Sequence, residues 1–335
     1  MYSSIKKEII YIISCVICLF CGCSSDDNLS IRYDNSIVCE DDYIAYITEN
    51  GSLFMLDKAG ADYAEDIDGL KKIQGGMTFI VMLYEDGTMC LWDTYTKSVI
   101  PFDEMGSIAF EHFYPAFELI TKAEDIQDFY YIYSEAILLL KNNKWYMGDN
   151  EVNKEICSKM DCKRIKKISV VPGYYNFMVL DEKGAISFMG NDMILDNYSQ
   201  ALKWHDIIDM DACENTIVGV DKNGRVRSTL TDVYENYYGK VSGWDNIKMV
   251  IVENNFTAGL TNDGKVLISE GLYSFYSDKR DLKKAEEWSN IVFISSANNY
   301  IMGIDINGKM WVTDPLLQET IDHHDCPSVW ISQAE

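Results

Sequence analysis

The sequence predicts an all-β fold, a seven-bladed β-propeller over residues 35–335 that is closed by pairing of its N- and C-terminal strands. Three observations predict it. Glycine-ended turns recur along most of the chain, an apolar segment precedes each turn, and a tryptophan-led segment precedes several of these hairpins. A period near 40 residues in strand-like sequence is typical of propellers.

The turns share one pattern, a polar residue followed by glycine between two apolar runs. They are Asn50-Gly51, Asp86-Gly87, Lys183-Gly184, Asn223-Gly224, Asp263-Gly264 and Asn307-Gly308. Apart from one gap, the glycines recur about every 40 residues. Asn-Gly and Asp-Gly supply the positive φ angles of a two-residue hairpin turn. Each unit is therefore expected to contain an antiparallel hairpin.

The strand before each turn is almost continuously apolar, so both of its faces should be buried. The residues four before and two after each turn glycine are apolar, and pairing across the hairpin would hold them in one layer. Three of these strands also contain a glycine five residues before the turn glycine: Gly219, Gly259 and Gly303. A strand glycine is destabilising unless something needs the space. Close approach near a crowded propeller axis is the expected reason.

A further strand precedes each hairpin and is marked by Trp204-His-Asp-Ile207, Trp244-Asp-Asn-Ile247 and Trp288-Ser-Asn-Ile291. The one gap in the glycine series holds a degenerate copy whose turn is Asn142-Asn143. Asparagine also tolerates the left-handed region, so this copy completes seven hairpins. Spacing around it leaves room for an insertion over 102–122.

These units resemble the regulator of chromosome condensation repeat family. Its members carry a tryptophan-led strand and a hairpin of the form small-residue-Leu-Thr-x-Asp-Gly-x-Val in seven blades. The segment Asn255-Phe-Thr-Ala-Gly-Leu-Thr-Asn-Asp-Gly-Lys-Val266 is similar to that hairpin. The family's usual Trp-Gly at the end of the second strand is missing, with only Met147-Gly148 and Met189-Gly190 keeping the glycine. The resemblance implies a diverged bacterial branch, and the founder's functions are not carried over.

Propellers often close by pairing terminal strands within one blade. The segment Val329-Trp-Ile331 looks like a surplus strand without a hairpin of its own. We expect Val329 to Ser332 to pair with the N-terminal repeat. An unrelated repeat protein with six or eight blades is the alternative.

The first 22 residues are typical of an export signal. Two lysines precede an apolar run from Ile9 to Phe20, which is too short to span a membrane. Gly22-Cys23 follows and resembles the lipobox of bacterial lipoproteins. The resemblance implies a signal peptide over 1–22, acylation of Cys23, a short linker over 23–34, and a propeller tethered to the bacterial cell membrane outside the cytoplasm.

The chain has 29 Lys and Arg against 53 Asp and Glu, a formal charge of −24. Such an acidic surface should repel nucleic acid phosphates, so no nucleic acid partner is expected. A cationic partner or calcium is one interpretation of the charge, and a solvated surface is the other. A disulfide between Cys39 and Cys326 is conceivable, because closure would bring the two ends of the propeller together.

No catalytic motif, cofactor site or metal site is predicted. Asp322-His-His-Asp-Cys326 lacks the spacing of a metal site and is interpreted as a solvated loop. The aromatic-rich insertion makes Phe113 and Tyr114 candidate ligand-binding residues. We expect a non-catalytic interaction module that binds a protein or a carbohydrate at the cell envelope. The alternative is an extracytoplasmic hydrolase or lyase with a loop-built site on a propeller face.

Overall fold

The structure is a computed structural model. It describes residues 36–40, 43–57, 62–65, 69–76, 79–94, 96–101, 125–133, 136–146, 155, 157–159, 165–171, 176–190, 198–213, 216–230, 240–271, 281–297, 300–324, 326 and 329. The signal peptide and linker expected over 1–34, and the insertion over 102–122, lie outside these ranges. In the part of the chain that is described, no helix is long and apolar enough to cross a membrane.

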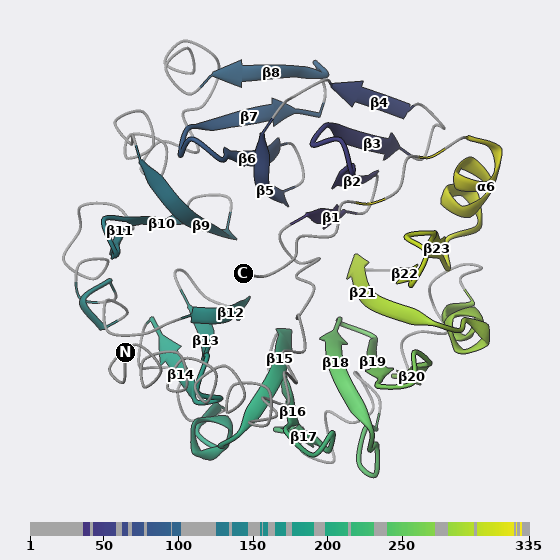
Figure 1. The fold of residues 1–335 in the computed structure, drawn as a ribbon. Helices are drawn as coiled ribbons and strands as arrows, with labels where there is room; N and C mark the ends of the chain where they lie inside the picture. The colour runs from purple at the N-terminus through teal and green to yellow at the C-terminus, as the bar shows by residue number, and fades with distance from the viewer. Residues whose placement is uncertain are drawn as a thin grey trace, which may run out of the picture. The chain divides into compact units, whose positions relative to one another are not determined.

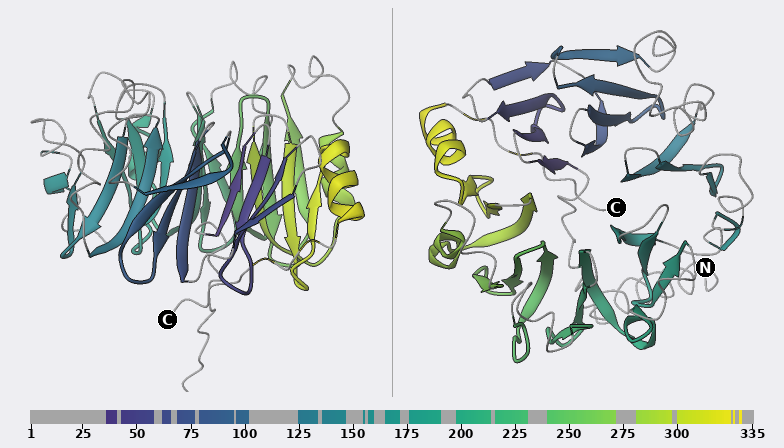
Figure 2. Two further views of the ribbon diagram at one scale, coloured as in Figure 1. Left: turned by 90° about the horizontal axis from the view of Figure 1, so that it is seen from above. Right: turned by 180° about the vertical axis from the view of Figure 1, so that it is seen from behind.

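Seven antiparallel sheets follow one another around a central axis, and each sheet is one blade (Figure 1). The first strand of every blade lies nearest the axis, as the right-hand view of Figure 2 also shows. The first two blades contain four described strands: β1 (Ile37–Cys39), β2 (Tyr43–Ile47), β3 (Leu53–Asp57) and β4 (Asp62–Glu65), then β5 (Leu70–Gly76), β6 (Phe79–Tyr84), β7 (Met89–Asp93) and β8 (Ser98–Pro101). The predicted seven-bladed propeller is confirmed.

The other five blades have three described strands each. Blades 3 and 4 are β9 (Ile126–Tyr133), β10 (Ala136–Lys141) and β11 (Lys144–Tyr146), then β12 (Ile165–Val170), β13 (Phe177–Asp181) and β14 (Ile186–Met189). Blades 5 to 7 are β15 (Ile207–Cys213), β16 (Thr216–Asp221) and β17 (Val226–Ser228), then β18 (Ile247–Val252), β19 (Phe256–Thr261) and β20 (Val266–Glu270), then β21 (Ile291–Ala297), β22 (Tyr300–Asp305) and β23 (Met310–Val312). Short helices η4 (Ala201–Lys203) and η6 (Leu282–Glu287) precede β15 and β21, and α6 (Pro315–His323) follows β23.

The middle strands form the core, as their apolar sequences predict. Every residue of β16, β19 and β22 is buried. The apolar residues four before and two after each turn glycine are direct partners across the hairpin, for example Leu260 with Val266 and Ile304 with Met310. Side chains from neighbouring blades pack together between the sheets and exclude water, which is the main source of stability in this fold.

The hairpin turns differ from the predicted two-residue turn. Gly224 has a φ of 74° and Gly264 a φ of 77°, but the residue before each has a negative φ. In blade 5 the Gly224 amide donates to the Asp221 carbonyl at 2.8 Å, and the Asp221 amide donates to the Arg225 carbonyl at 3.0 Å. This is the pattern of a three-residue loop that ends in a left-handed glycine. Among the hairpin turns that the structure describes, only the degenerate Asn142-Asn143 turn has two positive φ angles, 51° and 59°.

The turn glycines also join consecutive blades. The amide of Ile291 at the start of β21 donates to the carbonyl of Gly264 at 3.0 Å, and the same bond joins Ile247 to Gly224. The residue before each of these isoleucines, Asn290 or Asn246, has a φ near 60°. The Asn or Asp in the tryptophan-led motif is therefore there because it tolerates the left-handed region.

The strand glycines make room for tryptophan rings, and the expected crowding at the axis was wrong. A methyl group on Gly303 would lie 2.9 Å from Cε3 and Cζ3 of the Trp288 ring. Trp244 approaches Gly259 in the same way, at 2.8 Å and 2.9 Å. Each tryptophan that leads a blade thus packs on the bare backbone of that blade's middle strand.

The inner strands are linked by side chains that reach from one blade to the next. The Asp209 carboxylate on β15 accepts from Lys167 Nζ on β12 at 3.0 Å and from the Val250 amide on β18 at 2.8 Å. Asp211 accepts from the Ser169 hydroxyl at 3.0 Å and from the Val252 amide at 2.8 Å. These carboxylates satisfy backbone amides that have no strand partner, because inner strands of different blades do not pair.

The last and first blades are joined by two features. The Tyr300 hydroxyl on β22 donates to the Glu40 carbonyl at 2.9 Å. An isolated antiparallel bridge joins Val329 to Thr48 at the end of β2, and Val329 is buried. Residues 330–335 are not described, so a longer closing strand stays a prediction. Cys39 and Cys326 are not joined in a disulfide.

The turn aspartates provide a pH-dependent prediction. Oδ1 of buried Asp221 accepts from the amides of Asn223 and Arg225, and Oδ2 accepts from Arg227. Burial opposes ionisation, but these hydrogen bonds outweigh it and lower the carboxyl pKa. A lowered folded pKa gives stability that is present above the unfolded value near 3.8 and is lost as the pH falls through the folded pKa.

We therefore expect Asp221→Asn to lower the free energy of unfolding by about 1 kcal/mol at pH 7 and by less below pH 4. Blade 6 has Thr261 at this position, whose hydroxyl accepts from the Lys265 amide. Asp221→Thr is the matched variant: its hydroxyl can replace the acceptor, so its deficit at pH 7 should be smaller, and since it also lacks the carboxylate, that deficit should likewise shrink below pH 4. Urea unfolding at both pH values measures this. An Asn variant with the same deficit at every pH would contradict the account.

Candidate binding groove

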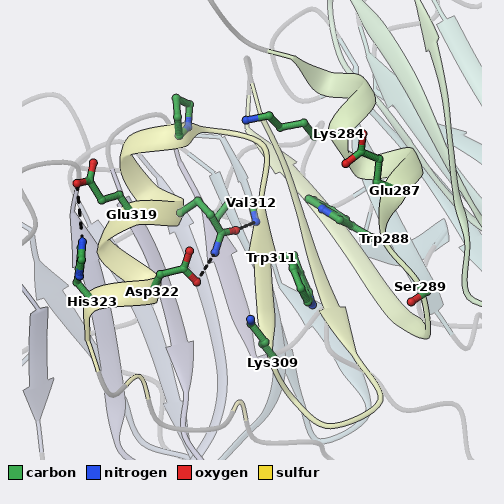
Figure 3. A pocket seen from close by; sticks show the side chains of 12 residues that line it. Lys284, Glu287, Trp288, Ser289, Lys309, Trp311, Val312, Glu319, Asp322 and His323 are labelled. Carbon is green, nitrogen blue, oxygen red and sulfur yellow. Dashed lines mark hydrogen bonds and ion pairs between the residues drawn. The ribbon is translucent and has the colours of Figure 1, made fainter.

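A groove of about 750 Å³ lies at the outer end of the interface between blades 6 and 7 (Figure 3). Its sides are η6, in the connection before β21, and α6, which follows β23 on the outside of the last blade (Figure 2). β23 forms the floor. The groove is lined by Lys284, Glu287, Trp288, Ser289, Lys309, Trp311, Val312, Pro315, Gln318, Glu319, Asp322 and His323.

Two half-buried tryptophans form the aromatic part of the groove. Trp311 on β23 pairs directly with Gly303 on β22, so the two residues share one face of the blade. Trp288 packs on the same glycine, which brings it beside Trp311 (Figure 3). The indole nitrogen of Trp311 donates to Asp305 Oδ2 at 3.3 Å and fixes the orientation of the ring.

Blades 5 and 6 have a leading tryptophan and a strand glycine like those of blade 7, but they differ in the residue that lies opposite the glycine on the next strand. The residue across from the strand glycine is Arg227 in blade 5, Leu267 in blade 6 and Trp311 in blade 7. The position is three residues after the turn glycine. Among the described blades, blade 7 alone has a second tryptophan beside the leading one. The aromatic pair is therefore specific to the last blade.

The helix α6 begins and packs for reasons visible in its sequence. The Asp314 carboxylate accepts from the amides of Leu316 and Leu317, and proline occupies the first turn. Leu317 and Ile321 are buried against the blade, and other residues of the helix, such as Glu319 and Asp322, line the groove. The region 322–323, expected to be a solvated loop, is the last turn of this helix. That expectation failed because the capped start at Asp314 was overlooked.

Hydrogen bonds and ion pairs organise the charged side of the groove. The Gln318 side chain accepts a hydrogen bond from the Val312 amide at 2.8 Å and donates one to Asp322 at 3.1 Å. The first bond satisfies a backbone amide at the edge of the sheet. Glu319 lies 3.8 Å from His323. Lys309 Nζ lies 4.2 Å from the centroid of the Trp311 ring, within the range of a cation–π contact.

This arrangement offers contact area and orienting charge to a ligand. The carboxylates of Glu287, Glu319 and Asp322 are exposed to solvent. Large aromatic faces beside exposed charges are what interaction surfaces use for contact area and orientation. Among the described residues, no group of three potential ligands is placed to hold a metal ion.

Two further carboxylates, those of Asp209 and Asp211, lie on the inner strand β15. Burial raises the pKa of Asp211, which lies next to Asp209 on β15. Each of the four carboxylate oxygens, however, already accepts a hydrogen bond from a neighbouring blade. These two residues therefore hold neighbouring blades together.

The site residues expected from sequence do not include this groove. Cys23, Phe113 and Tyr114 lie outside the described residues, so the structure does not test them. Trp288 was recognised only as the marker of a strand. The second tryptophan three residues after a turn glycine is the pattern that could have revealed the groove, because no other turn glycine is followed by tryptophan at that distance.

No protein-family model and no curated protein matches the sequence. Among solved structures, the ectodomain of the receptor kinase CR4 from Physcomitrella patens is similar at 13% identity, over 83% of this chain and 72% of that chain, with a TM-score of 0.51. BamB from Moraxella catarrhalis matches at 11% identity over 82% and 81% of the chains, with a TM-score of 0.39. Prp20p from Saccharomyces cerevisiae matches at 10% identity over 89% and 76%, with a TM-score of 0.37.

Prp20p is also named yeast RCC1. At these identities the likeness concerns the fold alone. The chain is a repeat-built, seven-bladed β-propeller, and the groove on its last blade is a feature of its own side chains.

Proposed function

We propose that the protein is a non-catalytic interaction module that is tethered to the bacterial cell membrane and binds a protein or glycan at the cell envelope. The groove is the observation that carries the proposal. It combines two tryptophan rings with exposed charges of both signs on a rigid blade. A binding surface needs this combination of contact area and orienting charge.

The tether is proposed from the sequence alone. The apolar run before Gly22-Cys23 supports export and acylation of Cys23. Cys23→Ser should abolish incorporation of a fatty-acid analogue and release the protein from the membrane fraction or leave it unprocessed. Unchanged labelling of the variant would remove the tether from the proposal without touching the groove.

Capture from cell-envelope extracts tests the binding function. Residues 24–335 serve as bait, and Trp311→Ala is compared with Leu267→Ala, which truncates the same repeat position in blade 6. A buried aromatic anchor typically contributes 2 kcal/mol or more to an interface, so we expect at least about a tenfold loss of captured partner for Trp311→Ala only. Equal capture by both variants, with matching thermal melts, would contradict binding in the groove.

A further inference from the structure

We propose that the groove binds a cationic side chain, the arginine or lysine of a segment of a partner protein, on the face of Trp311. This inference rests on the proposed function and names the chemistry of its ligand. The observation behind it is the position of Lys309. Its ammonium group already lies over the Trp311 ring, at 4.2 Å from the centroid. The ring face therefore attracts a cation, and the chain's own lysine occupies that place when no partner is bound.

Lys309 can be exchanged at low cost. It is exposed and follows the turn glycine of the last hairpin, where its long side chain is held by the ring contact. An exposed cation–π contact is weak, because water competes for the ammonium group. An incoming guanidinium can stack flat on the indole and use its remaining N–H groups for carboxylates, which an ammonium group does less well.

The charges around the two rings favour a cationic ligand over an anionic one. Glu287 lies on the η6 side of the groove, and Glu319 and Asp322 lie on α6 (Figure 3). These three carboxylates exceed the two ammonium groups of Lys284 and Lys309. The whole chain carries a formal charge of −24, so its field adds to the local preference and would steer cationic segments toward the protein.

A neutral glycan would use the same ring faces and could donate hydroxyl hydrogen bonds to the carboxylates, but it would bring no charge to offset theirs. It would also have to displace Lys309 without supplying a replacement cation. The three carboxylates of the groove and the lysine that already covers the Trp311 ring therefore favour a basic peptide segment as the ligand. A glycan ligand is kept as one of the outcomes of the test.

The test uses residues 24–335 labelled with 5-fluorotryptophan, with the ¹⁹F resonances of Trp288 and Trp311 assigned from Trp288→Phe and Trp311→Phe. The probes are the blocked peptide Ac-Gly-Arg-Gly-Arg-Gly-amide, its citrulline counterpart, which is neutral and nearly isosteric, and a β-1,4-linked tetramer of N-acetylglucosamine. We expect the arginine peptide alone to shift the Trp311 resonance saturably, and added salt to weaken the effect.

Three variants sharpen the test. Lys309→Met removes the internal cation and keeps the aliphatic stem, so it should bind the arginine peptide about threefold more tightly. Glu319→Gln combined with Asp322→Asn should bind it about threefold more weakly. Lys265→Met removes the lysine that follows the turn glycine of blade 6, where no tryptophan stands at the third position, and should change nothing.

Equal shifts with the citrulline peptide, a lower or unchanged affinity for Lys309→Met, or no shift at millimolar peptide would each overturn the inference. A shift with the tetrasaccharide alone would replace the cationic ligand by a glycan and leave the proposed function standing. If envelope capture is also insensitive to Trp311→Ala, the groove itself is not the binding site, and both proposals fail.

Discussion

Gly264→Val should lower the free energy of unfolding by at least about 3 kcal/mol. The glycine has a φ of 77°, a conformation that costs a β-branched residue about 1–2 kcal/mol or more. Its Cβ would also lie 3.0 Å from Cα of Asn290 and from the amide nitrogen of Ile291, which are backbone atoms of the next blade. Neither can give way without loosening the bond between the Ile291 amide and the Gly264 carbonyl.

Lys265→Ala is the control for this variant. The Lys265 side chain is 67% exposed, and its amide bonds do not depend on the side chain. Its unfolding free energy should stay within about 0.5 kcal/mol of the parent value. Urea unfolding followed by tryptophan fluorescence measures both proteins. Coincident curves for the valine variant and the parent would mean that this turn does not couple blades 6 and 7.

Asp209→Ala should lower the free energy of unfolding by about 3 kcal/mol, because this one residue links three blades. Its carboxylate joins Lys167 of blade 4 to the Val250 amide of blade 6, and both members of the ion pair are largely buried, with exposed side-chain fractions of 20% and 13%. Removing it leaves a lysine charge and a backbone amide near the axis without this acceptor.

The comparison for Asp209→Ala is a surface ion pair of the same kind. Lys222 and Asp206 are 3.0 Å apart in blade 5 with exposed fractions of 61% and 57%. Lys222→Ala should change the unfolding free energy by less than about 0.5 kcal/mol. Equal destabilisation by the two variants, measured in the same urea series, would show that the inner carboxylate has no special role in holding the blades.

The repeat could be predicted from sequence because its signals are local. A turn glycine, the apolar residues on either side of it and the leading tryptophan lie within one unit, and their spacing reports a hairpin directly. The role of Gly303 could not be found in this way. Its partner Trp288 is fifteen residues away in sequence and meets it only when the first and second strands of the blade are paired.

The links between blades were beyond sequence reasoning for a similar physical reason. Asp209 and Asp211 alternate with apolar residues on β15, a pattern that also fits a half-exposed strand. The partners of Asp209, Lys167 and Val250, lie about forty residues to either side, and only the propeller brings them into contact. The groove follows the same rule, since η6, β23 and α6 meet only at the outer edge of the last two blades.

Site-directed photocross-linking in intact cells tests the central claim, that the groove is where this propeller binds its partner. Ser289 lines the groove and carries no charge, so Ser289→p-benzoylphenylalanine places a reactive group there without altering the charged residues. Lys222→p-benzoylphenylalanine, on the exposed turn of blade 5, is the matched position. We predict a discrete cross-linked adduct from position 289 and none from position 222, and the adduct should vanish when Trp311→Ala is added. The same adducts from both positions, or an adduct from 289 that persists with Trp311→Ala, would contradict the claim.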